Sequence, residues 1–386
     1  MMNQKIGLEV ISPVYIGKGS DYSRAEFGLA SFSGINKIVR YNLDEVAQLI
    51  LKNEEDLFDE FINVISDTEN FKNRHADKSK VGYYGLQKFL IDKIKPKNPD
   101  LYKKIRNSYS YKCTIKYGKN IKYANDIGII KEHLKTNGGL YIPGSSIKGA
   151  IRNAFLYSRL NLNCGNNQIR RAIESMDKNL KNSMKFFHFT DTLNTIDEPS
   201  IYGVESIGTR RNTLSFLETI DEGNQFEFEY YNSFNMKIHN RRDLNDFPSD
   251  IDSIFKQIHD FSHDLIKEEL RFIKKTVPNS NYYDFDNGSL KNFYNELYKK
   301  NTVKTPLLRL GHGSGALTVS QLLKIKNSRR NQNQFTEFRS RNGIGKMKKK
   351  TGKNKKKEAV NYDFPKTRKL IVDTYKPLGW VQLSKK

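Results

Sequence analysis

The sequence is poor in cysteine and tryptophan and has no long apolar run. Its 386 residues include one tryptophan and two cysteines, Cys113 and Cys164, too few for a disulfide framework or a thiolate metal site. No apolar stretch approaches the roughly 18 residues of a membrane span. The opening residues, MMNQKI, contain no apolar signal core. These absences predict a cytoplasmic protein with no membrane partner.

The sequence also has few acidic residues relative to basic ones. Sixty-six Lys and Arg face 43 Asp and Glu, which gives a net charge of +23. Lys324–Lys357 holds fourteen basic residues and one acidic residue, and Lys93–Tyr123 holds ten and one, so the rest of the chain is almost neutral. Such an excess favours a polyanionic partner. The 23 Phe and 21 Tyr argue against wholesale disorder.

The two basic windows differ in kind. Lys346–Lys357 reads KMKKKTGKNKKK, which has no apolar periodicity and predicts a mobile basic arm over about 340–358. That arm is either a solvated linker or a polyanion-binding segment. The earlier window interleaves its lysines with tyrosines that either stack RNA bases or pack on a core. These tyrosines are Tyr102, Tyr109, Tyr111, Tyr117 and Tyr123.

Apolar periodicity predicts short strands interrupted by helices, which is typical of an α+β fold rather than a doubly wound parallel sheet. Strands are expected over residues 6–15, 140–142, 186–189, 204–207 and 225–231. Helices are expected over residues 43–63, 83–94, 127–133, 147–159, 251–275 and 290–299. Residues of about 40–135 therefore form a mainly helical insertion.

The segment Pro143–Arg152, PGSSIKGAIR, is the strongest local motif. Its Pro-Gly turn precedes a helix for which Ser145 or Ser146 is the expected cap. A helix start offers unpaired backbone N–H groups to a phosphate. Lys148 and Arg152 are four residues apart and would project from one helix face near that end. An ordinary capped helix is the alternative interpretation.

The sequence contains two patterns of regularly spaced glycines. Gly144 and Gly149 have the glycine spacing of a nucleotide-binding P-loop, but Ala150-Ile151 follows where a Lys-Ser/Thr pair is required, so no NTPase is predicted. Residues 309–315, RLGHGSG, have a glycine at every second position from 311, and such glycines let the backbone approach a ligand closely. On its own, this second pattern is common in tight turns.

The sequence contains no evident catalytic or metal-binding set. His259 and His263 are four residues apart, as in zinc proteases, but Asp260 replaces the glutamate base and no third ligand follows nearby. Two surface histidines explain the pattern better. No metal site and no cofactor are therefore expected.

Several segments together resemble the RAMP proteins of CRISPR systems. Residues 8–19, LEVISPVYIGKG, resemble their opening strand and loop, and residues 142–152, IPGSSIKGAIR, resemble their IPGSSLKGALR-type signature. Residues 308–315, LRLGHGSG, are similar to their C-terminal glycine-rich loop. The ending, with FPKTRK at 364–369 and PLGWV at 377–381, resembles the fifth Csm subunit of type III-A effector complexes.

The resemblance implies two ferredoxin-like (RRM-like) RAMP units. The first would span 1–215 and include the helical insertion at about 40–135, and the second would span 216–386 and include the basic arm. The implied function is an RNA-binding subunit that caps the 3′ end of the guide RNA (crRNA) and assists guide-RNA maturation in antiviral defence. Implied partners are the guide RNA, the repeated RAMP backbone subunit, the small helical Csm subunit and host nucleases.

Under this resemblance, RNA-binding residues are expected in three glycine-containing segments. They are Gly17, Lys18, Gly19, Gly144, Ser145, Ser146, Lys148, Arg152, Arg309, Gly311, His312, Gly313 and Gly315. The glycines would allow close backbone approach and the cations would neutralise phosphates. Such binding is led by the RNA backbone and tolerates sequence changes.

Two alternatives stay open beside a non-catalytic RNA-binding subunit. The repeated RAMP backbone subunit cuts target RNA with an Asp in an N-proximal loop, and Asp21 lies in the comparable region here. With Asp191, which follows the 186–189 strand, it is a weak catalytic candidate for a metal-assisted endoribonuclease acting on guide precursor or target RNA. The other alternative is a scaffold whose Lys346–Lys357 arm recruits acidic protein partners.

Overall fold

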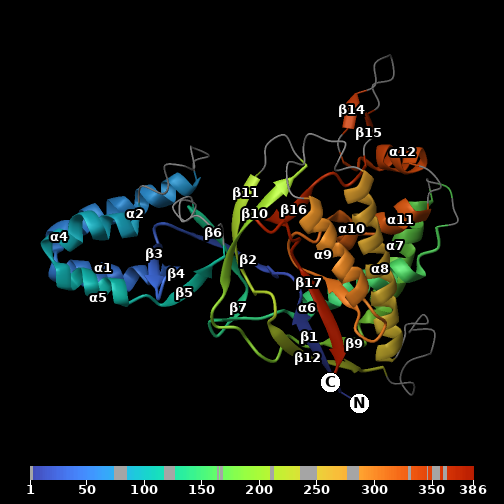
Figure 1. Cartoon of the computed structure of the whole chain (residues 1–386), viewed down its shortest axis with the longest axis horizontal. Helices are drawn as coiled ribbons and strands as arrows, with labels where there is room; N and C mark the ends of the chain where they lie inside the picture. Colours follow the sequence, from blue (N-terminus) through green and yellow to red (C-terminus); the bar gives the residue numbers. More distant parts are fainter. Residues whose placement is uncertain are drawn as a thin grey trace.

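The computed structural model shows an α+β protein with two main sheets, a helical layer and a projecting helical insertion (Figure 1). Its described residues are 3–73, 85–116, 127–162, 165, 168–208, 213–234, 250–275, 287–328, 332–345, 347–349, 357–359 and 363–386. Within these ranges, no helix has the length and apolar character needed to cross a membrane.

The first sheet has five strands in the order β13-β17-β1-β12-β9, and all neighbours are antiparallel. The strands are β1 (Gln4–Val10), β9 (Phe187–Phe189), β12 (Gln225–Asn232), β13 (Leu307–Arg309) and β17 (Trp380–Lys385). Helices α6 (Gly144–Arg159) and α8 (Ile251–Lys275) pack against it. The chain order β1-α6-β9-β12-α8-β17, with β17-β1-β12-β9 side by side, is that of a β-α-β-β-α-β unit.

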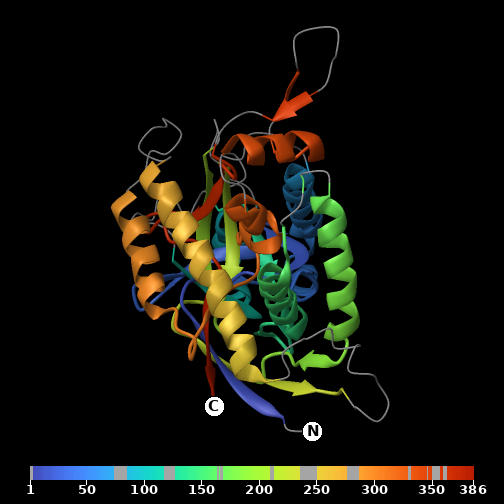
Figure 2. The same cartoon turned by 90° about the vertical axis from the view of Figure 1, so that its right-hand side faces the viewer.

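Alternation along the strands builds the core under α6 and α8. In β12, Phe226, Phe228 and Tyr230 are buried while the residues between them are partly exposed. Leu8 of β1 pairs with Phe226 and faces the same core. Figure 2 shows α8 running across this layer beside α9 (Asn287–Lys300).

The second sheet has eight strands and mixes parallel with antiparallel pairs. Its path is β2-β6-β11-β10-β5-β4-β3, with β16 also paired to β10. The bounds are β2 (Gly17–Ser23), β3 (Phe27–Phe32), β4 (Ile35–Arg40), β5 (Tyr111–Ile115), β6 (Ile129–His133), β10 (Ser200–Ile207), β11 (Thr213–Thr219) and β16 (Arg368–Ile371). The β10–β5 and β11–β6 pairs are parallel.

The predicted insertion is helical and has its own core, which projects to one side in Figure 1. It contains α1 (Leu43–Asn53), a short 3-10 turn (Glu55–Leu57), α2 (Phe58–Asn73), α3 (Leu86–Phe89), a π-helical turn (Leu90–Ile94), α4 (Lys95–Lys97) and α5 (Pro99–Asn107). The other elements are β7 (Lys135–Thr136), β8 (Gly139–Leu140), α7 (Ile169–Met184), α10 (Ala316–Val319), α11 (Leu322–Ser328), α12 (Gln332–Asn342), β14 (Met347–Lys349) and β15 (Lys357–Ala359).

Several predictions of secondary structure are confirmed and others are wrong: the strand predicted over 6–15 ends at Val10, and the helix predicted over 43–63 is interrupted between α1 and α2. The helix over 251–275 and the strand over 225–231 are present, the latter one residue longer. Residues 129–133 form β6 instead of a helix. The segment is too short to show a clear hydrophobic period, so its pairing with β2 and β11 determines its secondary structure. Helix α6 begins at Gly144 after Pro143, and neither Ser145 nor Ser146 caps it.

The sheets combine strands from both sides of the predicted boundary at residue 215. That boundary falls inside β11, and β1 pairs with β12 and β17 in the first sheet. The β-α-β-β-α-β unit therefore draws on both the 1–215 and 216–386 segments. A second ferredoxin-like unit stays a prediction.

Candidate functional site

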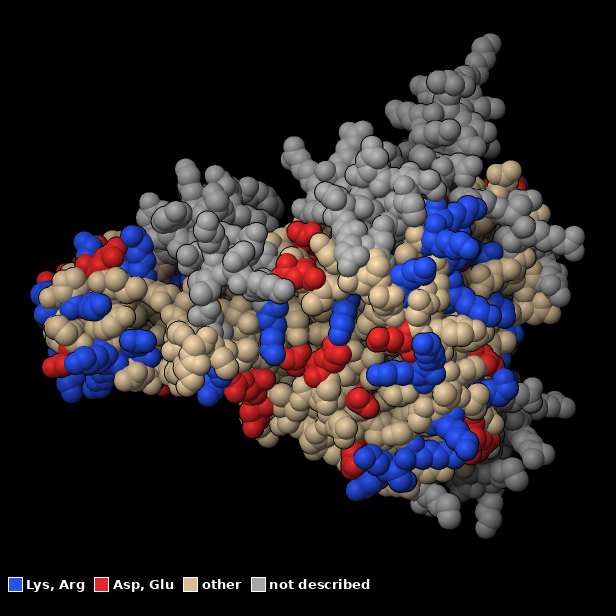
Figure 3. All heavy atoms as spheres, in the orientation of Figure 1, with Lys and Arg blue, Asp and Glu red and all other residues tan. Residues whose placement is uncertain are grey.

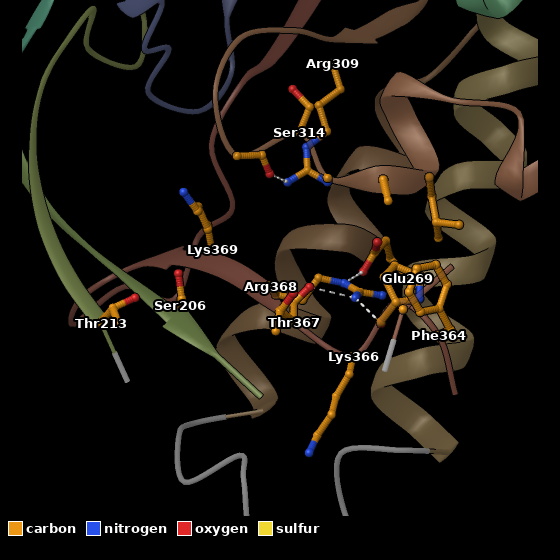
Figure 4. A pocket seen from close by; sticks show the side chains of 16 residues that line it. Ser206, Thr213, Glu269, Arg309, Ser314, Phe364, Lys366, Thr367, Arg368 and Lys369 are labelled. Carbon is orange, nitrogen blue, oxygen red and sulfur yellow. Dashed lines mark hydrogen bonds and ion pairs between the residues drawn. The ribbon is translucent and has the colours of Figure 1, made fainter. Parts of the chain in front are cut away.

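A cleft of about 630 Å³ lies where two segments far apart in the sequence meet the ends of β10 and β11 (Figure 4). One wall is the glycine loop, residues 310–315, which follows β13 and continues into α10. The other wall is the strap, residues 363–369, which leads into β16. Ser206 and Thr213 close a third side.

The charged residues that line the cleft are mainly cations. Arg309, Lys366, Arg368 and Lys369 line it, together with one carboxylate, Glu269 of α8. Figure 4 shows Lys366 and Lys369 extending from the strap in opposite directions. A concave surface with this excess of positive charge suits an anionic ligand.

A buried ion pair forms the floor of the cleft. Glu269 and Arg368 are 4% and 9% exposed, and Arg368 Nε donates to Glu269 Oε2 at 2.8 Å. Arg368 Nη1 also donates to the carbonyls of Pro365 and Thr367 at 2.6 and 3.0 Å. These three acceptors hold Nε and Nη1 of Arg368 in the floor of the cleft.

A second charge cluster anchors the beginning of the strap. Arg271 contacts Glu268 and Asp363 at 2.7 and 2.8 Å, and Lys326 of α11 contacts the same two carboxylates at 2.6 and 2.7 Å. Hydrogen bonds that Arg271 donates to Glu268 and Asp363 raise its pKa above the usual value. The strap is thus fixed to α8 and α11 before it reaches the cleft.

The glycine loop packs against the chain just before β2. The N–H of His312 donates to the Tyr15 carbonyl at 2.8 Å. Gly311 has φ 76°, and a Cβ there would lie 2.6 Å from that same carbonyl oxygen. Glycine is therefore required for this approach, and the loop lies beside the segment that carries Gly17, Lys18 and Gly19.

Arg309 is buried under the loop rather than exposed at its surface. It is 4% exposed, and its guanidinium donates to the carbonyls of Leu378 and Gly313 at 3.1 Å each. The guanidinium also lies 5.5 Å from the centre of the Trp380 ring. Arg309 therefore holds the shape of the glycine loop.

Lys369 and Lys131 bring positive charge to the outer side of the loop, beside His312. Lys369 Nζ lies 2.6 Å from His312 Nε2. Burial, together with the charges of Lys369 and Lys131, lowers the pKa of His312 to about 4, so His312 is neutral at pH 7 and accepts from Lys369. Burial and Lys131 also lower the pKa of Lys369. Among the described residues, no carboxylate pairs with Lys369.

At the N-terminus of α6, where a serine cap is predicted from the sequence, an aspartate accepts the backbone hydrogen bond instead. The N–H of Gly144 donates to Asp191 Oδ1 at 2.8 Å. A Cβ on Gly144 would lie 2.1 Å from the Phe189 carbonyl oxygen, so the helix start is pressed against the end of β9. Asp191, a weak catalytic candidate, acts here as the acceptor at the N-terminus of α6.

Lys148 and Arg152 have different surroundings although they lie on one helix. Arg152 forms an ion pair with Asp177 of α7. Lys148 is half-buried, its pKa is lowered by burial, and its charge helps to lower the pKa of His188. In the part of the chain that the structure describes, Lys148 has no ion-pair partner.

The first glycine segment is strand rather than loop. Gly17, Lys18 and Gly19 begin β2, and Lys18 Nζ lies 3.5 Å from Glu132 Oε2. Asp21 lies opposite Lys131 in the β2–β6 ladder. The described residues contain no group of three or more His, Cys, Asp or Glu side chains that could hold a metal ion.

Sequence reasoning missed the strap and Lys131 as parts of the site. The run FPKTRK was visible at 364–369, but nothing local shows that it lies against a loop more than 50 residues earlier. Lys131 stood in a segment expected to be helical. Alternate residues of a strand face one side, so the correct β6 assignment would have directed attention to it.

The tyrosines of the early basic window serve packing where they are described. Tyr102 packs in the insertion core, Tyr109 contacts Phe32, and the Tyr111 hydroxyl donates to buried Glu218. Tyr117 and Tyr123 lie outside the described residues.

Part of the predicted basic arm, over about 340–358, also lies outside the described residues, because the structure describes only 340–345, 347–349 and 357–358 of it. Within it, β14 pairs with β15. Figure 3 shows Lys and Arg side chains on the insertion and on the helical body, with acidic side chains between them.

His259 and His263 stack on each other with ring centres 5.8 Å apart. Each also contacts the aspartate that follows it, Asp260 at 2.9 Å and Asp264 at 3.5 Å. These contacts account for the histidine pair without a ligand.

Comparison with known families decides the membership of the chain. The sequence model of the RAMP superfamily matches residues 7–384. The chain belongs to the RAMP superfamily. The glycine loop and the strap of this RAMP protein lie within the matched range.

Individual relatives of this RAMP protein are distant but cover it almost completely. A protein of Methanocaldococcus jannaschii named CRISPR system Cms protein Csm5 is 22% identical over 416 residues, which are 99% of this chain and 89% of that protein. A chain in the cryo-EM structure of a type III-A Csm–crRNA–target RNA ternary complex has a TM-score of 0.63 at 20% identity, covering 99% of this chain and 100% of that one. The crystal structure of T. onnurineus Csm5 has a TM-score of 0.57 at 19% identity, covering 97% and 99%.

Proposed function

We propose that this chain is the RNA-binding fifth subunit of a type III-A Csm effector complex. The observation that carries the proposal is the basic cleft between the glycine loop and the strap, because two segments that resemble the family form its walls. Membership of the RAMP superfamily and the names of the distant relatives support it. In this proposal the chain caps the 3′ end of the guide RNA and assists its maturation, and it is not itself a nuclease.

The residues divide into phosphate-binding and positioning groups. Lys369, Lys131 and Lys148 are proposed to neutralise phosphates, since none of them is held by a carboxylate in an ion pair found in the described structure. Arg309 positions the glycine loop, and Arg152 is held by Asp177. The other proposed RNA-contacting residues are Gly17, Lys18, Gly19, Gly144, Ser145, Ser146, Gly311, His312, Gly313 and Gly315, of which Gly144 is buried and has its N–H held by Asp191.

The proposed partners follow from the same assignment. They are the guide RNA, the repeated RAMP backbone subunit, the small helical subunit of the Csm complex and host nucleases, all in the cytoplasm. A second ferredoxin-like unit built around the second sheet is part of the proposal. The antiparallel β10–β11 hairpin and its β16 neighbour support that unit.

Ribonuclease protection tests the capping role. A Csm complex reconstituted with guide RNA is expected to protect a longer 3′ segment when this chain is present than when it is omitted. The 5′ boundary of the protected RNA should be the same in both samples and serves as the internal control. Identical 3′ boundaries with and without the chain would refute the capping proposal.

A further inference from the structure

The cleft between the glycine loop and the strap is closed at its inner end. Its floor is the Glu269–Arg368 ion pair, both members of which are buried, whereas Thr367 on the rim is exposed. The cavity, about 630 Å³, is within the range that holds a small organic ligand. Because the floor is buried, a terminal nucleotide can reach it more readily than a nucleotide inside a chain. This inference rests on the proposed RNA binding.

The rim of the cleft offers a place for a phosphate. Gly313, Ser314 and Gly315 line the cavity, and within the described structure their backbone N–H groups donate to no acceptor. Gly313 and Gly315 have φ of 86° and 82°. Successive backbone N–H groups in a turn can converge on one anion. Lys369, on the facing wall, adds a cation that no described carboxylate neutralises.

The floor presents a carboxylate, which repels phosphate but accepts hydroxyl groups. Oε2 of Glu269 accepts from Arg368, and no described residue donates to Oε1. Arg368 turns donors toward Glu269, Pro365 and Thr367. Carboxylates recognise the ribose hydroxyls of nucleotides in the same manner. A phosphate placed here would face a like charge in a buried setting.

We propose that this cleft binds the 3′-terminal nucleotide of an RNA strand, with its 5′-side phosphate at the glycine loop and Lys369 and its free 2′,3′-diol at Glu269. The pocket therefore selects RNA that ends in a hydroxyl and rejects RNA that ends in a phosphate. It is a terminal-nucleotide site inside the proposed RNA-binding surface.

The test compares four RNAs of one sequence on the purified full-length chain. They are a linear RNA with a 3′-hydroxyl, the same RNA with a 3′-phosphate, the same with a 2′,3′-cyclic phosphate, and a circular form. We expect the hydroxyl form to bind at least about tenfold more tightly than the other three, because each of those loses donors to a buried charged acceptor. Equal affinity for all four overturns the terminal pocket while leaving RNA binding intact. Absence of binding to any of them contradicts the proposed function itself.

Variants of the chain test whether the carboxylate in the floor causes the selectivity for a 3′-hydroxyl end. Glu269→Gln keeps a carbonyl acceptor without charge and is expected to reduce the discrimination against the 3′-phosphate. Lys256→Ala, on the same helix and about 20 Å away along its axis, is the matched control and should retain the full discrimination. Discrimination that survives in a folded Glu269→Gln protein contradicts the role of the carboxylate. If that variant does not fold, the four-RNA comparison on the unaltered chain decides alone.

Discussion

Replacing Lys131 and Lys369 together by alanine is expected to weaken RNA binding by about 100-fold at fixed salt. Each lysine is proposed to contact phosphate, and a hydrogen bond to a charged group contributes about 1.5–3 kcal/mol. Because each lost contact also removes one released counterion, the slope of log K against log salt should become shallower by about 1.4 for single-stranded RNA. Fluorescence anisotropy over a salt titration measures both quantities.

A charge-matched control separates local contacts from bulk attraction. Lys256 and Lys385 are partly exposed and paired with Asp260 and Asp252, outside the cleft. Their double alanine variant removes the same formal charge. If it weakens RNA binding as much as the Lys131 and Lys369 pair does, net charge rather than the cleft governs binding.

Alanine at Gly144 is expected to lower the free energy of unfolding by about 3 kcal/mol, the upper end of overpacking costs. The added Cβ would lie 2.1 Å from the Phe189 carbonyl oxygen and 2.6 Å from that of Thr190. Both atoms belong to backbone that the β9–β12 pairing holds, so neither is free to withdraw. Urea denaturation followed by circular dichroism gives the change in midpoint and slope.

Gly149, five residues later in the same motif, supplies the control. A Cβ there meets nothing within 4 Å, and the residue is exposed in the interior of α6. Gly149→Ala should therefore raise the free energy of unfolding by up to about 1 kcal/mol, as expected from helix propensity. Two alanine variants with the same effect would show that the motif glycines serve something other than this packing.

Elements with a strong local period were predictable from sequence. The 25-residue helix α8 has both expected bounds, and β12 shows its alternating aromatics directly. Residues 129–133 were not predictable, because a strand of five residues is fixed by its neighbours. The partner of the Gly144 N–H is Asp191, 47 residues away, and no local cap signal identifies such a residue.

The site charges were harder to predict than the site loops. The glycine loop was identified from its glycines, but burial of Arg309 beneath it depends on carbonyls of Gly313 and Leu378 that only the fold brings together. Lys131 and Lys369, the cations at the loop, lie outside both highly basic windows of the sequence. The direct contacts with RNA are therefore proposed to come from a few residues in the nearly neutral part of the chain.

Cross-linking of the guide RNA terminus tests the central claim most directly. A guide RNA with 4-thiouridine as its 3′-terminal nucleotide is assembled into the complex, irradiated and digested, and the linked peptides are identified by mass spectrometry. The account predicts cross-links to residues 309, 313–317 and 364–369, which line the cleft. Cross-links confined to another subunit, or to the helical insertion of this chain, would contradict it.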